Sequence, residues 1–215
     1  MLSSAGFQPN IHTLEILLPV GISFYTFQTL SYTIDIYRNR LESESNLISF
    51  ASYVTFFPQL VAGPIERAAH LLPQFSTEKR FDAQVASEGL RYMLWGFFMK
   101  LVIADNAAII VNEIFDSYDM VSGTSLYFGA LLFAFQIYGD FAGYSYIAIG
   151  VAKLFGFDLM TNFRYPYLST NISDFWRRWH ISLSTWFRDY VYIPLGGNRE
   201  GLRKHFRNLF LTFFI

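Results

Sequence analysis

Residues 120–139, MVSGTSLYFGALLFAFQIYG, form a run of 20 residues without Asp, Glu, Lys, Arg or His. An α-helix of about 20 mainly apolar residues crosses the ~30 Å hydrocarbon core of a bilayer. Two further runs free of these residue types cover 16–34, with 19 residues, and 45–65, with 21 residues. Three such runs in 215 residues predict a membrane protein. The alternative, buried helices of a large soluble protein, suits one such run better than three.

The composition agrees with a membrane protein and excludes several kinds of chemistry. Charged residues make up 15% of the chain, against about 25% in an ordinary soluble domain. Aromatic residues make up 20%, a load that suits lipid contact and interfacial belts. The net charge of −1 argues against nucleic-acid binding. The absence of Cys from the 215 residues excludes a thiolate nucleophile, a disulfide framework and a Cys-ligated metal within them.

Two other segments complete the expected set of spans. Residues 90–111 are apolar apart from Arg91, Lys100 and Asp105, and are predicted to span with these charges facing protein or the helix ends. Residues 206–215 resemble the start of another span. The regular elements are all expected to be helices.

Residues 120–152 would form a helix of roughly 50 Å if they were continuous. Gly139, Asp140 and Gly143 lie inside this stretch, so we predict that the helix breaks there. We find no internal repeat and no linker that would divide the chain.

Basic residues indicate which side the loops face. Nine of the 16 Lys and Arg residues lie within 153–207, whereas loop 112–119 has none. Because cytoplasmic loops are enriched in Lys and Arg, 112–119 is predicted to lie outside and the basic loops inside. Basic residues on both sides of 45–65 then conflict with a single crossing. Pro58, Gly63 and Pro64 interrupt this run, so we predict a re-entrant segment.

The segment richest in chemistry is 171–199, NISDFWRRWHISLSTWFRDYVYIPLGGNR. Ser173 is a plausible N-cap, Asp174 stands in the first turn, and Asp174 and Arg178 have the i, i+4 spacing of an ion pair. A continuous helix would place the following residues on one face: Trp176, His180, Leu183, Phe187 and Tyr190. Pro194 and the glycines after it end the pattern with a turn.

His180 is the candidate catalytic residue of this segment. Acyl transfer to a hydroxyl group needs a base near neutral pH, and the ordinary pKa of histidine is about 6.5. Burial and the neighbouring Arg177 would both favour the neutral form. Ser184 and Asp174 are candidates to orient the imidazole. No histidine pair in the chain has a zinc-type spacing, so no metal site is predicted.

The same residues allow a structural interpretation. A single histidine among aromatic rings is more often a hydrogen-bonded structural residue than a catalyst. Trp176 and Trp179 could belong to an interfacial belt, and Arg177 and Arg178 could lie beside lipid headgroups. From residue chemistry alone, both interpretations stay open.

Four blocks of the chain resemble the membrane-bound O-acyltransferase family, in the branch of bacterial alginate O-acetylation proteins and D-alanyl transfer proteins of teichoic acid. They are LPVGISFYTFQTLSYTIDIYR (18–38), YVTFFPQLVAGPIER (53–67), QIYGDFAGYSYIAIGVAKLFGF (136–157) and NISDFWRRWHISLSTWFRDYVYIPLGGNR (171–199). The resemblance implies an all-α fold, with multiple transmembrane helices and re-entrant or broken segments around an acyl-transfer tunnel. It also implies a multi-pass protein of the bacterial inner membrane.

The resemblance implies the function and its residues as well. The family's functional histidine falls on His180, and the neighbours expected to line the substrate channel are Asp174, Trp176, Arg177, Arg178, Trp179 and Ser184. An acyl group, most simply acetyl, would move from a cytoplasmic thioester donor, acetyl-CoA or an acyl carrier, toward a cell-surface polysaccharide such as alginate. Transfer would be direct or through an extracytoplasmic, esterase-like acyltransferase partner. No bound cofactor is expected.

The sequence also departs from the family pattern. Tyr146 stands where the family's GYSD motif has Asp. Residues 1–215 are expected to be a single membrane domain that forms part of the family's core, without its N-terminal spans and its later block with a second histidine. Two non-catalytic functions remain as alternatives. One is a transporter or flippase that uses Lys100, Asp105 and Asp140 as intramembrane polar groups, and the other is a scaffold subunit for polysaccharide modification.

Overall fold

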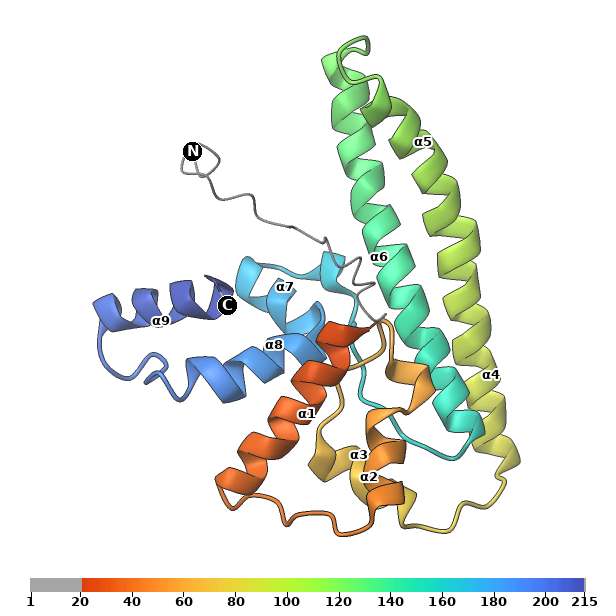
Figure 1. Cartoon of the computed structure of the whole chain (residues 1–215). Helices are drawn as coiled ribbons and strands as arrows, with labels where there is room; N and C mark the ends of the chain where they lie inside the picture. Colours follow the sequence, from red (N-terminus) through yellow and green to blue (C-terminus); the bar gives the residue numbers. More distant parts are fainter. Residues whose placement is uncertain (1–20, 215) are drawn as a thin grey trace, which may run out of the picture.

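The computed structural model describes residues 21–214, and every regular element in this range is a helix. Figure 1 shows their arrangement along the chain. The α-helices are α1 (Ile22–Tyr37), α2 (Leu47–Val54), α3 (Ala68–Phe75), α4 (Ala83–Phe97), α5 (Asp105–Asp116), α6 (Gly123–Leu154), α7 (Ile172–Arg178), α8 (Ile181–Phe187) and α9 (Leu202–Phe214). The shorter elements are the 3-10 turns η2 (Phe57–Gln59) and η4 (Pro166–Leu168) and the π-helical segments η3 (Phe98–Ala104) and η5 (Arg188–Tyr192).

Two long helical rods form an antiparallel hairpin. The first joins α4, η3 and α5 without interruption over 34 residues, Ala83–Asp116, and the second is α6 with 32 residues. Both are long and apolar enough to cross a membrane. The helix predicted for 90–111 is therefore confirmed. The connection after α5 lies at one tip of the hairpin, whereas α4 begins and α6 ends at the opposite tip (Figure 1).

The predicted break in 120–152 is wrong, because α6 is continuous through Gly139, Asp140 and Gly143. The glycines serve close packing instead. A Cβ added to Gly143 would lie 2.8 Å from the carbonyl oxygen of Gly96, and one added to Gly139 would lie 3.0 Å from that of Met99. Small residues allow two helix backbones to approach in this way. Asp140 forms an ion pair with Lys100 of η3, with 2.7 Å between the Lys100 Nζ and an Asp140 carboxylate oxygen.

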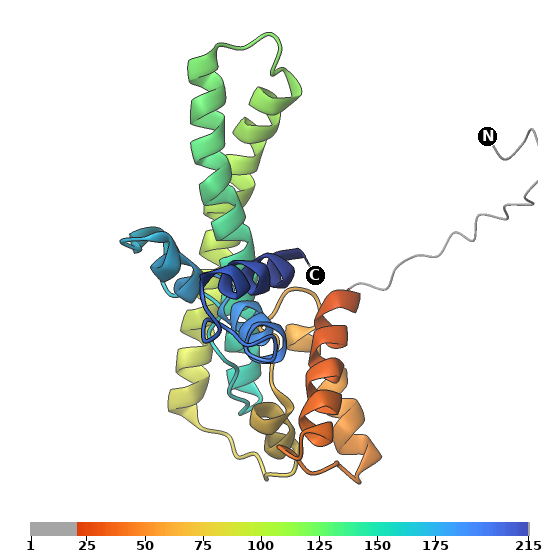
Figure 2. The ribbon, with the colours of Figure 1, turned by 90° about the vertical axis from the view of Figure 1, so that its left-hand side faces the viewer.

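Helices α1, α2 and α3 pack beside the lower half of the hairpin (Figure 2). The run 45–65 contains only the eight-residue α2 and the turn η2, which holds Pro58, so the predicted interruption is confirmed. Its return to the same side of the membrane stays a prediction. The run 16–34 is helical from Ile22, and its first residues, 16–20, lie outside the described part of the chain. A core joins this layer to α6 through buried side chains that include Tyr53, Leu71 and Ile149.

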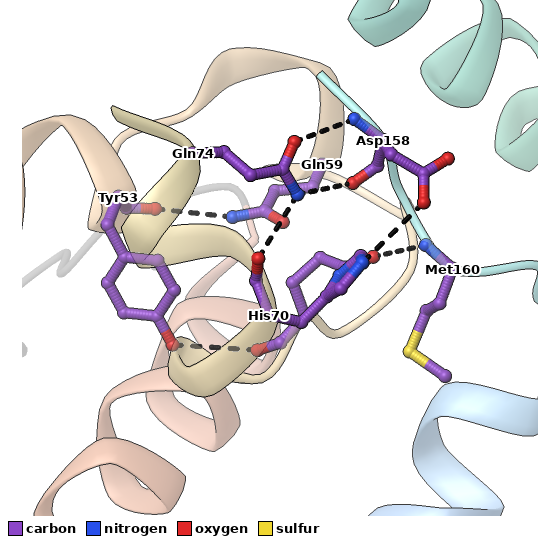
Figure 3. A network of polar contacts seen from close by, with 7 residues as sticks. Tyr53, Gln59, His70, Gln74, Asp158 and Met160 are labelled. Carbon is purple, nitrogen blue, oxygen red and sulfur yellow. Dashed lines mark hydrogen bonds and ion pairs between the residues drawn. The ribbon is translucent and has the colours of Figure 1, made fainter. Parts of the chain in front are cut away.

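Polar side chains join the α1–α3 layer to the loop that follows α6. Figure 3 shows a network that involves Tyr53, His70 and Met160. The Glu66 carboxylate is 1% exposed; it accepts a hydrogen bond from the Met160 backbone amide and lies 2.7 Å from the His70 Nδ1. His70 Nε2 also lies 3.5 Å from Asp158. The hydrogen bond to Glu66 raises the pKa of His70 above its ordinary value, since the carboxylate favours the charged imidazolium. Within residues 21–214, no group of three or more metal-ligating side chains gathers here or elsewhere.

Candidate active site

The helix predicted across the WRRWH segment is wrong at its centre. α7 ends at Arg178 and α8 begins at Ile181, and His180 between them has the left-handed backbone angles φ 43° and ψ 55°. The N-cap is Asn171, not Ser173: its side chain accepts a hydrogen bond of 2.8 Å from the Asp174 amide. The turn predicted around Pro194 is confirmed.

The break is held by the loop that follows α6. The carbonyl oxygen of Asn162 accepts a hydrogen bond of 2.9 Å from the Ile181 amide, and the Arg164 amide donates one of 2.9 Å to the carbonyl oxygen of Arg178. The loop therefore pairs with the backbone on both sides of His180. The pairing gives the Ile181 amide and the Arg178 carbonyl oxygen partners at the break, where unpaired backbone groups would be costly.

Aromatic rings surround the imidazole of His180. The ring of Phe141 on α6 lies edge-on to it, with 4.7 Å between centroids, and that of Phe24 on α1 lies at 6.4 Å. The Nε2 atom is buried and has no hydrogen-bond partner among residues 21–214. Burial lowers the pKa of His180 to about 4, so the ring is neutral at physiological pH. His180 lies outside the two rods that are long enough to cross a membrane.

A cavity of about 480 Å³ opens beside His180, between the α7–α8 segment and α9. Its walls are mainly apolar and aromatic, as expected for a site that holds an acyl group or another small molecule. The lining residues are Trp176, Trp179, His180, Leu183, Ser184, Phe187, Arg188, Tyr192, Leu209, Thr212 and Phe213. Within residues 21–214, the structure therefore places the neutral side chain of His180, whose buried Nε2 has no hydrogen-bond partner there, beside an aromatic cavity.

The model of the membrane-bound O-acyltransferase family matches residues 38–215, which include His180 and every residue that lines the cavity. The chain belongs to this family. It is 47% identical over its full length to the "Probable alginate O-acetylase" of Pseudomonas fluorescens. It is 38% identical over 96% of its length to the peptidoglycan O-acetyltransferase of Helicobacter pylori, and 32% identical over 86% to the teichoic acid D-alanyltransferase of Bacillus subtilis. The matched parts are 43%, 44% and 48% of these relatives, so the chain spans less than half of their length.

Within this acyltransferase-family chain, four of the predicted site residues line the cavity. They are His180, Trp176, Trp179 and Ser184. Trp179 also stacks on Phe175 and packs edge-on against Phe163, with centroid distances of 5.6 and 5.1 Å. Its indole thus closes the cavity on the side of the loop that follows α6.

The other three predicted residues lie away from the cavity lining. Asp174 and Arg178 form the expected ion pair, 3.0 Å between carboxylate oxygen and guanidinium nitrogen, and the Arg178 hydrogen bond lowers the pKa of Asp174. Arg177 is exposed. The predicted roles of Asp174 and Ser184 in orienting the imidazole are wrong. Asp174 is engaged by Arg178, and the Ser184 hydroxyl donates a hydrogen bond of 3.2 Å to the Trp179 carbonyl oxygen.

Tyr146, which replaces the aspartate of the family pattern, lies on α6 with its ring near Tyr92, at a centroid distance of 5.9 Å. It does not line the cavity beside His180.

Residues that the sequence did not single out complete the site. Asn162, Ser145 and Ser182 are polar side chains with at most 2% exposure. They form a hydrogen-bonded chain that runs from α6 to the first turn of α8. An Asn in a loop carries no sequence signal for such burial, and only a structure brings these three side chains together.

Proposed function

We propose that the protein containing this chain is an O-acyltransferase of the bacterial inner membrane, and that His180 is its base. It moves an acyl group, most simply acetyl, from a cytoplasmic thioester toward a cell-surface polysaccharide such as alginate. The observation that supports the proposal is the buried Nε2 of His180, which has no hydrogen-bond partner in the described part of the chain and belongs to a side chain that lines the aromatic cavity. Family membership and the O-acyl transfer named for two of the relatives support the reaction type.

The chemistry follows from the state of the imidazole. Neutral His180 takes the proton of the acceptor hydroxyl as its oxygen attacks the thioester carbonyl carbon. A carbon–oxygen bond forms, the carbon–sulfur bond breaks, and the imidazolium returns its proton to the leaving thiolate. With its pKa lowered to about 4, His180 starts each cycle unprotonated. The indoles of Trp176 and Trp179 would line the acyl channel.

We propose a donor, an acceptor and a partner protein for the reaction. A soluble thioester, acetyl-CoA or an acyl carrier, would deliver the group from the basic, cytoplasmic side of the hairpin. The acceptor would be the polysaccharide itself, or an extracytoplasmic esterase-like acyltransferase that passes the group on. The tunnel that joins the two sides would run through the region beside His180.

His180→Ala in the full-length parent tests the proposal. We expect the loss of polysaccharide acylation by two orders of magnitude or more at normal membrane expression, because general base catalysis contributes about 10²–10⁴-fold. Ser173→Ala is the matched control, since Ser173 is exposed on the same segment, and it should retain activity. Wild-type acylation by His180→Ala would contradict the assignment of His180 as the base. If deletion of the whole protein then still abolished acylation, a scaffold function would be favoured.

A further inference from the structure

The backbone at His180 adopts a conformation that its local sequence does not explain. Residues 172–193 contain neither Gly nor Pro, and Asp174 and Arg178 support a continuous helix. His180 is nevertheless in the left-handed region, which disfavours side chains other than Gly. A strained conformation of this kind persists only when surrounding contacts hold it.

Asn162 supplies most of these contacts. It is fully buried, and its carbonyl oxygen accepts a hydrogen bond of 2.9 Å from the Ile181 amide. Its side-chain Oδ1 accepts two more from Ser182, from the amide at 3.2 Å and from the hydroxyl at 2.8 Å. The Asn162 side chain therefore binds the first turn of α8, immediately after His180.

These bonds replace the bonds of a continuous helix. In an α-helix the Ile181 amide would donate to the Arg177 carbonyl oxygen, and the Ser182 amide to that of Arg178. Here both amides donate to Asn162, and the Arg178 carbonyl oxygen accepts from the Arg164 amide instead. The loop after α6 thus takes up the donors and the acceptor that would otherwise join α7 to α8.

The Asn162 side chain also connects the break between α7 and α8 to helix α6. Asn162 Nδ2 donates a hydrogen bond of 3.3 Å to the hydroxyl of Ser145 on α6. Phe141 lies one helical turn before Ser145, and its ring packs against the imidazole of His180. Backbone and ring of His180 are therefore both fixed relative to one stretch of the same long helix.

We infer that Asn162 is a positioning residue, whose side chain keeps α7 and α8 apart and thereby holds the His180 imidazole in the wall of the cavity. The inference rests on the proposed function of His180. Without the Asn162 amide, the segment 172–193 is free to straighten into the continuous helix that its sequence favours. Straightening rotates His180 out of contact with Phe141.

The first test is kinetic, in the full-length parent. Asn162→Ala removes the three side-chain bonds and leaves the main-chain bond to Ile181 in place. We expect kcat to fall by roughly 100-fold, the scale of a 1 Å misplacement, with the KM for the thioester donor within about twofold of the parent. Ser182→Ala, which removes one of the two bonds from Ser182, should give a smaller fall. Asn106→Ala on α5 is the matched control, because Asn106 is exposed and distant, and should have normal kinetics.

The second test measures the geometry directly. Spin labels on cysteines at Ile172 and Ile193 flank the break at exposed positions, and this chain has no cysteine of its own. A straight helix would separate these residues by about 32 Å along its axis. In the bent parent we expect a shorter distance, and in Asn162→Ala a shift toward the straight value, which a merely local loss of stability would not produce.

The outcomes separate the two proposals. Loss of acylation in His180→Ala with parental kcat and label distance in Asn162→Ala overturns the role of Asn162 and leaves the proposed function standing. A lengthened label distance with parental activity in Asn162→Ala also overturns it, because the break would then not serve the reaction. Full activity of His180→Ala defeats the proposed function instead. If Asn162→Ala does not fold, Ser182→Ala becomes the test variant. A lowered kcat with unchanged KM in Ser182→Ala supports the inference, and a parental kcat overturns it.

Discussion

The imidazole of His180 and the ring of Phe141 meet edge to face, with 4.7 Å between their centroids and an interplanar angle of 79°. Phe141 lies on α6, one of the two long rods, whereas His180 lies in a short break between two helices of 7 residues each. The long helix α6 thus supplies part of the burial that shields the proposed base from water. This shielding is the physical cause of the low pKa of His180.

The pH dependence of acyl transfer should show this burial. Since the pKa of His180 is about 4, kcat/KM should stay level as the pH falls through 6.5 and decline only near pH 4–5. Phe141→Ala admits water to the imidazole, which raises its pKa toward 6.5 and moves the decline to higher pH. The measurement is kcat/KM against pH in membranes that contain the full-length protein.

Phe133→Ala provides the control for this shift. Phe133 lies on the same helix and packs against Phe115, well away from the site. Its replacement should leave the pH profile unchanged. A parental profile that already declines at pH 6.5, and that Phe141→Ala does not move, would contradict a buried His180 as the base.

The long rods could be predicted from sequence because their signal is local and repeated. Residues 90–111 and 120–139 are apolar over enough length to specify a helix without reference to other parts of the chain. The break predicted at Gly139 and Gly143 failed for the opposite reason. Glycine weakens a helix locally, but here its lack of a side chain allows α4 and α6 to touch, a gain that exists only between two helices.

In the site too, local sequence predicted some features, whereas others depend on contacts with distant residues. The composition of residues 171–199 and the family resemblance marked seven site residues, of which His180, Trp176, Trp179 and Ser184 line the cavity, and Asp174, Arg177 and Arg178 do not. The conformation of His180 depends on Asn162, 18 residues earlier, and the low exposure of its ring depends on Phe141. Neither contact can be recognised from the residue pattern of 171–190. The local helix signals of this segment therefore predicted a continuous helix.

The ion pair of His70 and Glu66 should make stability depend on pH. The pKa of His70 is raised in the folded state, so its contribution is fully present below the unfolded pKa of about 6.5 and is lost as pH rises through the folded value. His70→Gln should therefore lower the thermal midpoint at pH 6 and have little effect at pH 9. The expected loss is on the order of 1 kcal/mol, since the His70 side chain is 44% exposed.

Thermal unfolding of the detergent-solubilised protein at the two pH values measures this difference. Glu78→Gln is the control, because the Glu78 side chain is 77% exposed and, within residues 21–214, pairs only with the exposed Arg80. It should lower the midpoint by little at either pH. Equal losses for His70→Gln at pH 6 and pH 9 would show that His70 acts through packing rather than charge.

The contact between α4 and α6 should tolerate no side chain at its glycines. A Cβ on Gly96 would lie 2.6 Å from the carbonyl oxygen of Gly143, and one on Gly150 would lie 2.5 Å from that of Gly89. Because backbone atoms cannot give way as a flexible side chain can, Gly96→Val and Gly150→Val should cost about 1–3 kcal/mol or more. We expect lower thermal midpoints and a smaller yield of folded protein.

Gly123 offers the matched control for the glycine variants. It begins α6, and a Cβ there would meet nothing within 4 Å. Gly123→Val should therefore give nearly the parental midpoint. If Gly123→Val and Gly96→Val lost the same amount, the loss would come from the substitution of glycine in a helix as such, and not from the helix contact.

Neutralising Lys100 should lower the stability of the folded protein more than neutralising either Asp105 or Asp140, its two ion-pair partners. Its Nζ lies 2.7 Å from Asp105 and 2.7 Å from Asp140, near the midpoints of both rods. Lys100→Met leaves two carboxylates without a cation, whereas Asp140→Asn leaves the pair of Lys100 and Asp105 intact. An uncompensated charge near the bilayer centre costs roughly 3 kcal/mol, so Lys100→Met should give the lowest thermal midpoint of the single variants.

The double variant Lys100→Met with Asp140→Asn distinguishes charge balance from lost packing. It removes one cation and one carboxylate, so it should recover part of the stability that Lys100→Met loses alone. Adding Asp105→Asn should recover more, because no charge then remains in the group. If each added substitution lowered the midpoint further, the three side chains would contribute through packing and individual hydrogen bonds. Recovery would instead establish that the hairpin tolerates these polar groups because Lys100 neutralises them, and would argue against their use as the intramembrane polar groups of a transporter or flippase.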